Sequence, residues 1–163
     1  MIFPEIIVSQ AQSFEDYRGE LFTIHKKGDF GLEFNHDKVS ISKKNVLRGL
    51  HGDDKAWKLI TCLSGEIYLV IVDYRKDSKN YLKWDSIVLT SKNKKSILVP
   101  PGFANGHLVL SQEATFFYKW AYDGEYPDVT NQFSINWEDP KIGIDWPIKN
   151  PVLSDRDKKS KYL

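Results

Sequence analysis

The sequence contains one cysteine, one methionine and almost no net charge. Cys62 cannot form a disulfide within the chain, and its place in an apolar run predicts a buried thiol in a reducing, cytoplasmic protein. Twenty-three basic against 22 acidic residues leave a net charge of +1, so no overall field favours nucleic acid or an anionic membrane. No apolar run reaches the ~18 residues of a transmembrane helix, and residues 1–10 lack the features of a signal peptide.

Helical periodicity is also scarce. The best helical candidate, Lys26–Phe34, contains two glycines, which predicts a brief helix at most. Short apolar and β-branched runs instead alternate with turn residues, at the spacing of an all-β sandwich or jelly roll. The chain shows no repeat and no linker, so we expect a single domain over residues 1–163, with a partly mobile tail at 158–163. The expected strands are Phe14–Ile24, Asp37–Ser42, Leu59–Leu63, Ile67–Asp73, Trp84–Leu89, Ser96–Val99, Gly106–Leu110, Ala114–Trp120 and Gln132–Trp137.

Several basic residues stand near the ends of these strands. The segment 44–51 predicts a strand that places Arg48 and Leu50 on one face. Arg18, Arg48 and Lys58 could contact phosphates, and the imidazole of His51 could act as a general base. Taken singly, Arg48 could equally pair with a carboxylate and His51 could cap a loop.

Other polar groups also allow two interpretations. Tyr118 shares a strand face with Phe116 and Trp120, either in an aromatic core with its hydroxyl bonded to a backbone carbonyl or as a proton donor in a cavity. The segment Asp155–Asp157 is typical of a solvated charge cluster. Four histidines, His25, His36, His51 and His107, lack the spacing of metal ligands, so we expect neither a metal nor another cofactor.

A resemblance to a known family runs from about Phe14 to Asp157. The motifs that carry it are Asp16–Gly19, Lys43–His51, Lys58-Leu59, Ser64–Glu66, Val72–Ser78, Val99–Ala104, Phe117–Lys119, Gly143–Pro147 and Leu153-Ser154. In this order they resemble the dTDP-4-dehydrorhamnose 3,5-epimerases. The resemblance implies a metal-free cupin jelly roll, usually a homodimer, that acts on a nucleoside diphosphate 4-keto-6-deoxy sugar in surface-polysaccharide or related deoxysugar biosynthesis.

The resemblance also implies residue roles. The C-4 ketone acidifies the protons at C-3 and C-5, so that a base can remove one and an acid on the opposite ring face can return it with inverted configuration. His51 looks like the base and Asp157 like its carboxylate partner, while Lys58 resembles the cation that stabilises the enolate oxygen. Tyr118 matches the acid. Arg18 and Arg48 resemble the residues that hold the diphosphate or the sugar.

Several positions depart from the family pattern. Gly52-Asp53 replaces an aromatic residue and Gln after the proposed base. Because the four proposed catalytic positions are kept while substrate-facing ones change, we expect the same proton chemistry on a different substrate. The altered positions expected to bind substrate are Thr23 (for Glu), His36 and Lys38 (in place of Gln-Asp-Asn), Asn105 (for His), Gln132 (for an acid) and Arg156 (for Lys).

Two other functions stay open from the sequence. A sugar-nucleotide 3,4-ketoisomerase would use the same enolate but move the carbonyl, and such enzymes carry paired histidines near the base that are absent here. A non-catalytic sugar-nucleotide-binding cupin would need no acid together with a base.

Overall fold

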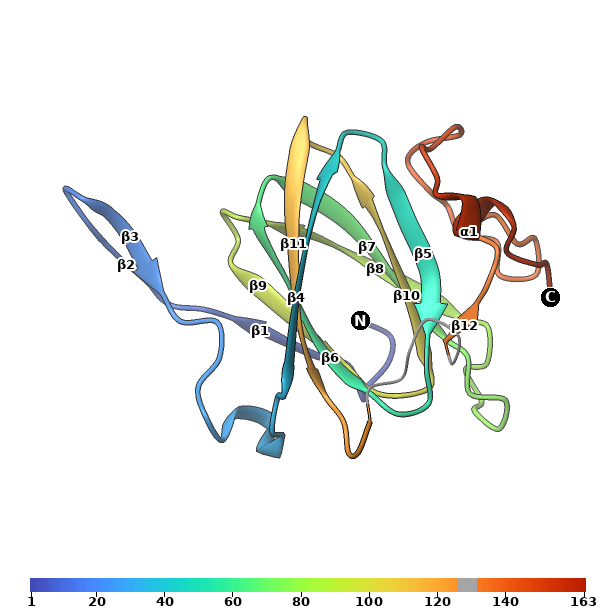
Figure 1. Cartoon of the computed structure of the whole chain (residues 1–163), viewed down its shortest axis with the longest axis horizontal. Helices are drawn as coiled ribbons and strands as arrows, with labels where there is room; N and C mark the ends of the chain where they lie inside the picture. Colours follow the sequence, from blue (N-terminus) through green and yellow to red (C-terminus); the bar gives the residue numbers. More distant parts are fainter. Residues whose placement is uncertain (126–131) are drawn as a thin grey trace.

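The protein is a β-sandwich with one projecting hairpin (Figure 1). The computed structural model describes residues 1–125 and 132–163. Two five-stranded antiparallel sheets have the orders β1-β9-β6-β11-β4 and β12-β5-β10-β7-β8, which confirms the all-β prediction. The elements are β1 Ile7–Gln10, β2 Ser13–Asp16, β3 Gly19–Phe22, η1 Asp29–Gly31, β4 His36–Lys43, β5 Leu47–Gly52, β6 Trp57–Ser64, β7 Glu66–Asp73, β8 Trp84–Thr90, β9 Lys95–Val99, β10 Phe103–Val109, β11 Glu113–Ala121, β12 Phe133–Ser134 and α1 Asp155–Lys158.

Most predicted strands appear within a few residues of their expected bounds. The Lys26–Phe34 candidate is the single 3-10 turn η1, as its two glycines predict. The strand predicted at Gln132–Trp137 is too long, because β12 covers only Phe133–Ser134, and beyond it Ile135 still exchanges backbone hydrogen bonds with Leu50 of β5. The strand β1 and the helix α1 were not predicted. Among the described residues, no helix is long and apolar enough to cross a membrane.

Strand β7 divides the hydrophobic core into two layers. Its alternate residues Leu69 and Ile71 pack between the two sheets, whereas Val70 and Val72 pack on the outer side, under the C-terminal segment. A strand buried on both faces is expected to be a continuous apolar run, as this one is. Cys62 lies in the inner layer, where burial raises the pKa of its thiol to about 11, so the prediction of a buried thiol is confirmed.

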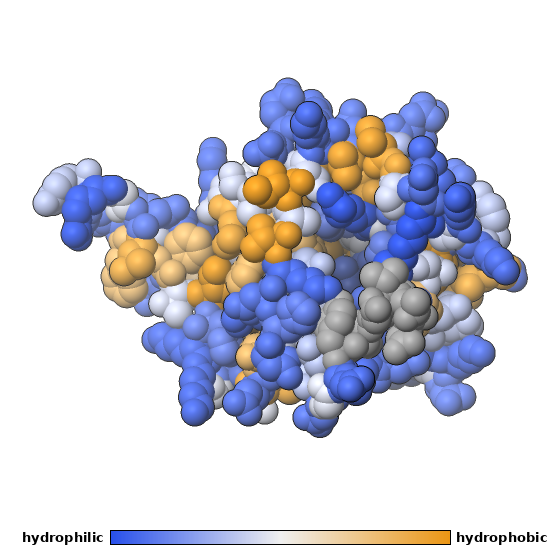
Figure 2. Space-filling model, viewed as in Figure 1, coloured by the Kyte–Doolittle hydropathy of each residue, from blue (hydrophilic) through white to orange (hydrophobic). Residues whose placement is uncertain are grey.

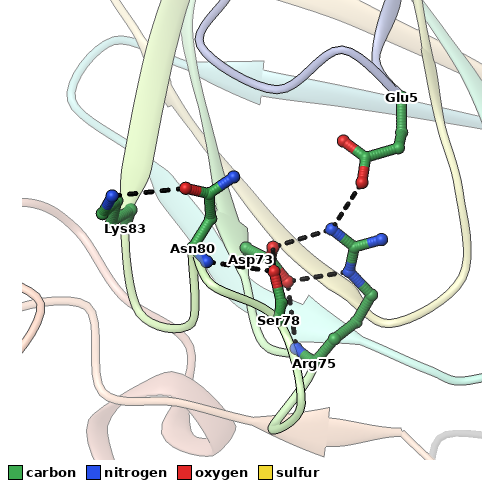
Figure 3. A network of polar contacts seen from close by, with 6 residues as sticks. All are labelled: Glu5, Asp73, Arg75, Ser78, Asn80 and Lys83. Carbon is green, nitrogen blue, oxygen red and sulfur yellow. Dashed lines mark hydrogen bonds and ion pairs between the residues drawn. The ribbon is translucent and has the colours of Figure 1, made fainter.

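A polar network at the end of β7 anchors the loop that follows it (Figure 3). The buried carboxylate of Asp73 accepts hydrogen bonds from Arg75 Nε at 2.9 Å and from Ser78 Oγ at 2.6 Å. Arg75 also donates to Glu5 at 2.9 Å, and its guanidinium lies 4.4 Å from the centre of the Phe103 ring. The network therefore ties the N-terminal segment and the β7–β8 loop to the start of β10, a strand that lines the cavity described below.

The hairpin of β2 and β3 projects from the sandwich (Figure 1). An ion pair of 2.7 Å between Glu20 and Lys94 joins it to the body. Phe14 and Leu21 are exposed on the hairpin, and Figure 2 shows hydrophobic surface there and beside it on the same face.

Candidate active site

A cavity of about 300 Å³ opens between the two sheets. Both sheets and the segment around α1 contribute to its walls. Its lining residues are Lys38, Ser40, Arg48, His51, Lys58, Ile60, Asn105, His107, Phe116, Tyr118, Trp120, Gln132, Ser154, Arg156 and Asp157. All four residues expected to be catalytic are therefore brought together.

A β-bulge in β5 brings Arg48 and His51 to the same wall. On β10, Asn105 faces His51 and His107 faces Arg48, so two residues of β5 stand opposite one of β10. The extra residue reverses the normal alternation of side chains. The expectation that Arg48 and Leu50 share a face is therefore wrong, since Arg48 lines the cavity while Leu50 is buried in the outer core layer.

The bulge requires a glycine at position 49. Gly49 has φ 120°, which other residues rarely adopt, and a Cβ there would lie 2.6 Å from the Cα of Gly106. The close approach of β5 and β10 thus explains the Gly49 in the Arg-Gly-Leu-His motif.

The imidazole of His51 forms a hydrogen bond with a buried carboxylate from the far end of the chain. His51 Nε2 lies 2.7 Å from Asp157 Oδ1. Ser154 caps α1 by accepting from the Asp157 N–H at 3.2 Å, and its hydroxyl donates to Asp157 Oδ2 at 2.8 Å. Asp157 is 2% exposed, so the expectation of a solvated cluster is wrong for this residue. The Asp157 carboxylate is buried because the cap formed by Ser154 turns this side chain toward β5.

These contacts keep the Asp157 carboxylate charged. Burial alone would raise its pKa, but the hydrogen bonds from His51, from Ser154 and from the Gly49 N–H outweigh burial, so that the pKa lies below its ordinary value. A fixed anion beside an imidazole orients the ring and stabilises its protonated form.

The ammonium group of Lys58 lies on the facing sheet. It is buried, pairs with Asp53 Oδ2 at 2.9 Å and lies 4.7 Å from the centre of the Trp120 ring. Burial lowers the pKa of Lys58, and the charge of Asp53 opposes that effect. The side chain thus presents a desolvated cation to the cavity, where it can stabilise a developing oxyanion.

The phenol of Tyr118 lies on the same sheet as Lys58. Its ring packs between Phe116 and Trp120, with centroids 4.9 and 5.7 Å away. Burial raises the pKa of the phenol, while the charge of Arg48 partly offsets this effect. Tyr118 lines the cavity, and no hydrogen bond from its hydroxyl to a backbone carbonyl occurs among the described residues. This geometry favours the proton-donor interpretation.

Two guanidinium groups are held by neutral side chains. Arg48 Nε donates to Ser42 Oγ at 2.9 Å, and Arg156 Nη2 donates to Ser134 Oγ at 2.9 Å and to Gln132 Oε1 at 3.2 Å. Neither arginine forms an ion pair within the part of the chain that the structure describes. Their charge is therefore available to an anion in the cavity.

The remaining predicted residues are divided between the cavity and its surroundings. Lys38 and Asn105 line the cavity with Gln132 and Arg156. His36 lies on β4 outside the lining, with its Nδ1 3.4 Å from the Tyr122 hydroxyl. Thr23 is exposed just after β3, and Arg18 stands at the tip of the hairpin, where it pairs with Asp16.

Sequence reasoning missed several residues of the site. Ser40 stands two positions after Lys38 on β4 and shares its face, and the Ser154-x-x-Asp157 spacing is a capping-box signal. Asp53 was noted as a departure, but its pairing with Lys58 was not predicted. Across residues 1–125 and 132–163, no group of three or more His, Cys, Asp or Glu side chains is arranged to hold a metal ion.

Known proteins are similar to this chain in both sequence and fold. The profile of the dTDP-4-dehydrorhamnose 3,5-epimerase family matches residues 1–163. The chain belongs to this family. The Shigella flexneri dTDP-4-dehydrorhamnose 3,5-epimerase is 37% identical over 94% of this chain and 88% of its own length.

Solved structures of epimerases agree with this assignment. The Legionella pneumophila enzyme in complex with dTDP-4-keto-L-rhamnose has a TM-score of 0.92 and 33% identity, over 99% of this chain and 89% of that one. The Bacillus anthracis enzyme with TDP and pyrophosphate bound has a TM-score of 0.93 and 31% identity, over 100% and 97%. The cupin-type jelly roll is thereby confirmed, and the chain is an isomerase of the epimerase class.

Proposed function

We propose that the protein inverts C-3, C-5 or both beside the C-4 ketone of a nucleoside diphosphate 4-keto-6-deoxy sugar. The proposal rests on one observation, that the acid–base groups project into the cavity from opposite sheets. His51 and its partner Asp157 border the cavity from the side of β5, whereas Lys58 and Tyr118 project from the facing sheet. A sugar ring between the sheets would meet a base on one face and an acid on the other, as inversion requires.

The proposed reaction begins when His51 removes a proton from the carbon next to the ketone. The electron pair of the C–H bond moves into the ring, and the negative charge develops on the C-4 oxygen, where Lys58 stabilises it. Asp157 stabilises the imidazolium that forms. Tyr118 then donates a proton to the opposite face of the same carbon and restores the ketone. Solvent returns the phenol and the imidazole to their starting protonation states.

The cations of the cavity support a nucleoside diphosphate as the other half of the substrate. The hydrogen-bond partners of Arg48 and Arg156 are neutral hydroxyl and amide groups, so no carboxylate among the described residues offsets their charge. The planar guanidinium matches the oxygens of a diphosphate. Lys38, Asn105 and Gln132 complete the proposed substrate contacts. We assign the reaction to cytoplasmic deoxysugar biosynthesis for surface polysaccharides or related products.

Solvent exchange in D₂O tests the proposal. The protein is incubated with dTDP-4-keto-6-deoxy-D-glucose and with its GDP, UDP and CDP counterparts, and the product is analysed by NMR and mass spectrometry. An epimerase incorporates deuterium at an inverted carbon, a 3,4-ketoisomerase moves the carbonyl and a binding protein does neither. The variant His51→Asn should lose exchange at every carbon while its circular dichroism stays unchanged. Activity of that variant within tenfold of the unaltered protein would remove His51 from the role of base.

We further propose that the active form is a homodimer in which each hairpin completes the partner's site. Phe14 and Leu21 on the hairpin, and Val39 and Ile41 on the edge strand β4, are exposed apolar side chains that a second copy would cover. Arg18 does not line the cavity of its own chain. The roles proposed for Arg18 and Thr23 therefore require their delivery by the partner, with His36 at the border between the copies.

Light scattering and subunit mixing test the dimer. We expect a mass of twice 18.9 kDa, and a monomer mass at micromolar concentration would contradict the proposal. Leu21→Glu should shift the protein to monomer, whereas Val88→Glu, on the edge strand of the other sheet, should not. Refolding Arg18→Ala together with His51→Asn should restore about one quarter of the activity, since half of the random dimers hold one intact site of two. No recovery would mean that Arg18 does not act across the dimer.

A further inference from the structure

The inner wall of the cavity contains one imidazole among apolar groups. His107 is 4% exposed, and its ring stacks on Phe116 with centroids 4.2 Å apart and an interplanar angle of 9°. Ile60, which is fully buried, lines the cavity from the same sheet as Phe116. The Nε2 atom of His107 is enclosed and has no hydrogen-bond partner among the described residues.

A second polar group, on the facing sheet, also lacks a partner. Ser40 stands directly opposite Phe116 in the β4–β11 ladder and lines the cavity. Its Oγ is enclosed and forms no hydrogen bond within the described parts of the chain. The imidazole and the hydroxyl thus border the same phenylalanine ring. Buried polar groups are nearly always hydrogen-bonded, so two unpaired ones in a cavity indicate that a ligand supplies their partners.

The charge of His107 limits what that ligand group can be. Burial lowers the pKa of the imidazole to about 3, and the nearby charges of Arg48 and His51 contribute to the shift. The ring is therefore neutral near pH 7, with one donor and one acceptor. A neutral imidazole suits a hydroxyl or carbonyl oxygen, whereas a phosphate is better matched by Arg48 and Arg156. It is also a poor general base at this pH.

We propose that His107 and Ser40 form a hydrogen-bonding subsite for a neutral oxygen of the sugar, and that this subsite selects the sugar rather than the nucleotide. The inference rests on the proposed function only in taking a sugar nucleotide as the occupant. Neither the proton transfers assigned to His51 and Tyr118 nor the charge stabilisation assigned to Lys58 involves these two residues.

Paired binding measurements test the subsite without turnover. Calorimetry gives the dissociation constants of dTDP and of dTDP-6-deoxy-D-glucose, which has no ketone, and their ratio measures what the sugar contributes. His107→Phe keeps an aromatic ring against Phe116 but removes both nitrogens. We expect it to weaken binding of the conjugate about tenfold, the size of one hydrogen bond, and to leave dTDP within twofold. Ser40→Ala should weaken the conjugate about threefold, and His107→Gln should restore part of the loss.

The matched control is His25→Phe. His25 is also an imidazole with an enclosed, unpaired Nε2 against a phenylalanine, but it lies outside the cavity. It should change neither dissociation constant. Equal losses for dTDP and the conjugate in His107→Phe, or no loss for either, would overturn the inference. The inference would also be overturned if the unaltered protein bound the dTDP-6-deoxy-D-glucose conjugate no more tightly than dTDP. Should His107→Phe fail to fold, Ser40→Ala and His107→Gln decide in the same way. Binding with the expected pattern but without deuterium exchange would refute the proposed function and leave the subsite standing.

Discussion

Replacement of Tyr118 by phenylalanine separates proton removal from proton return. The ring would keep its contacts with Phe116 and Trp120, and the hydroxyl forms no hydrogen bond among the described residues that the variant would lose. We therefore expect the free energy of unfolding to change by less than ~1 kcal/mol. An aromatic-core role with a bonded hydroxyl would instead require a loss of stability in parallel with activity.

The effect on catalysis should be large and specific. Loss of a positioned general acid typically slows a reaction about 10²- to 10⁴-fold, so formation of inverted product should fall by that factor. The variant leaves His51 and Lys58 in place, so the proton can still be removed and the enolate can still form. The proton on His51 can exchange with solvent and return to the face it left. In D₂O we thus expect deuterium in the starting sugar with retained configuration.

The assay follows deuterium and configuration at C-3 and C-5 by NMR over time. Tyr74→Phe is the matched control, because Tyr74 is also half-buried, packs 4.6 Å from Phe133 and does not line the cavity. It should leave both exchange and inversion unchanged. Inversion by Tyr118→Phe at the unaltered rate would refute the role of Tyr118, and loss of exchange together with inversion would show that it acts before or during abstraction.

Two further substitutions test the charged partners. Asp157→Asn should lower turnover about 100-fold or more, because the imidazolium of His51 loses its anion; activity in a chain that ends at Leu153 would contradict this role. Since the folded-state pKa of Asp157 is lowered, its contribution to stability is complete above the unfolded value of about 4 and is lost as pH falls through the folded value. The variant should therefore show a smaller difference in unfolding free energy between pH 7 and pH 3, measured in urea. Asp53→Asn should destabilise the fold by about 3 kcal/mol, because it leaves the buried ammonium group of Lys58 without its anion. The loss of that anion should also lower the pKa of Lys58 further, so the alkaline limb of the pH profile of kcat should move to lower pH. An unmoved limb would show that the charge of Lys58 is not needed.

Local pattern predicted the strands of the sandwich well and the face of each residue less well. Runs such as Ile67–Asp73 are apolar because both of their faces are buried, and that signal is local. The bulge between Arg48 and His51 depends on β10, which lies more than 50 residues away in the chain, so period-two alternation fails there. The short strand β1 has partly exposed residues and pairs only with β9, and its pattern was therefore weak.

Some residues of the candidate site could likewise be found from the sequence, whereas others depend on tertiary contacts. Lys58 and Tyr118 lie on regular strands and His51 follows the bulge of β5, and the order of the motifs was enough to find all three. Asp157 comes from a charged tail in which the neighbouring Asp155 is exposed. Only the tertiary contact with His51 on β5 distinguishes the buried carboxylate of Asp157 from that of Asp155. The unpaired state of His107 is likewise a property of the packed wall, and no spacing in the sequence reports it.

Overall charge and local charge lead to different conclusions about the ligand. A net charge of +1 offers no overall field for a long polyanion. The cavity nevertheless collects Lys38, Arg48, Lys58 and Arg156 around a single lining carboxylate, Asp157. The carboxylate serves His51, Asp53 behind the wall serves Lys58, and the two arginines are held by neutral acceptors. The charges of Arg48 and Arg156 therefore remain for the diphosphate of a sugar nucleotide. Lys58, paired with Asp53, stands ready for the charge that develops when the enolate forms.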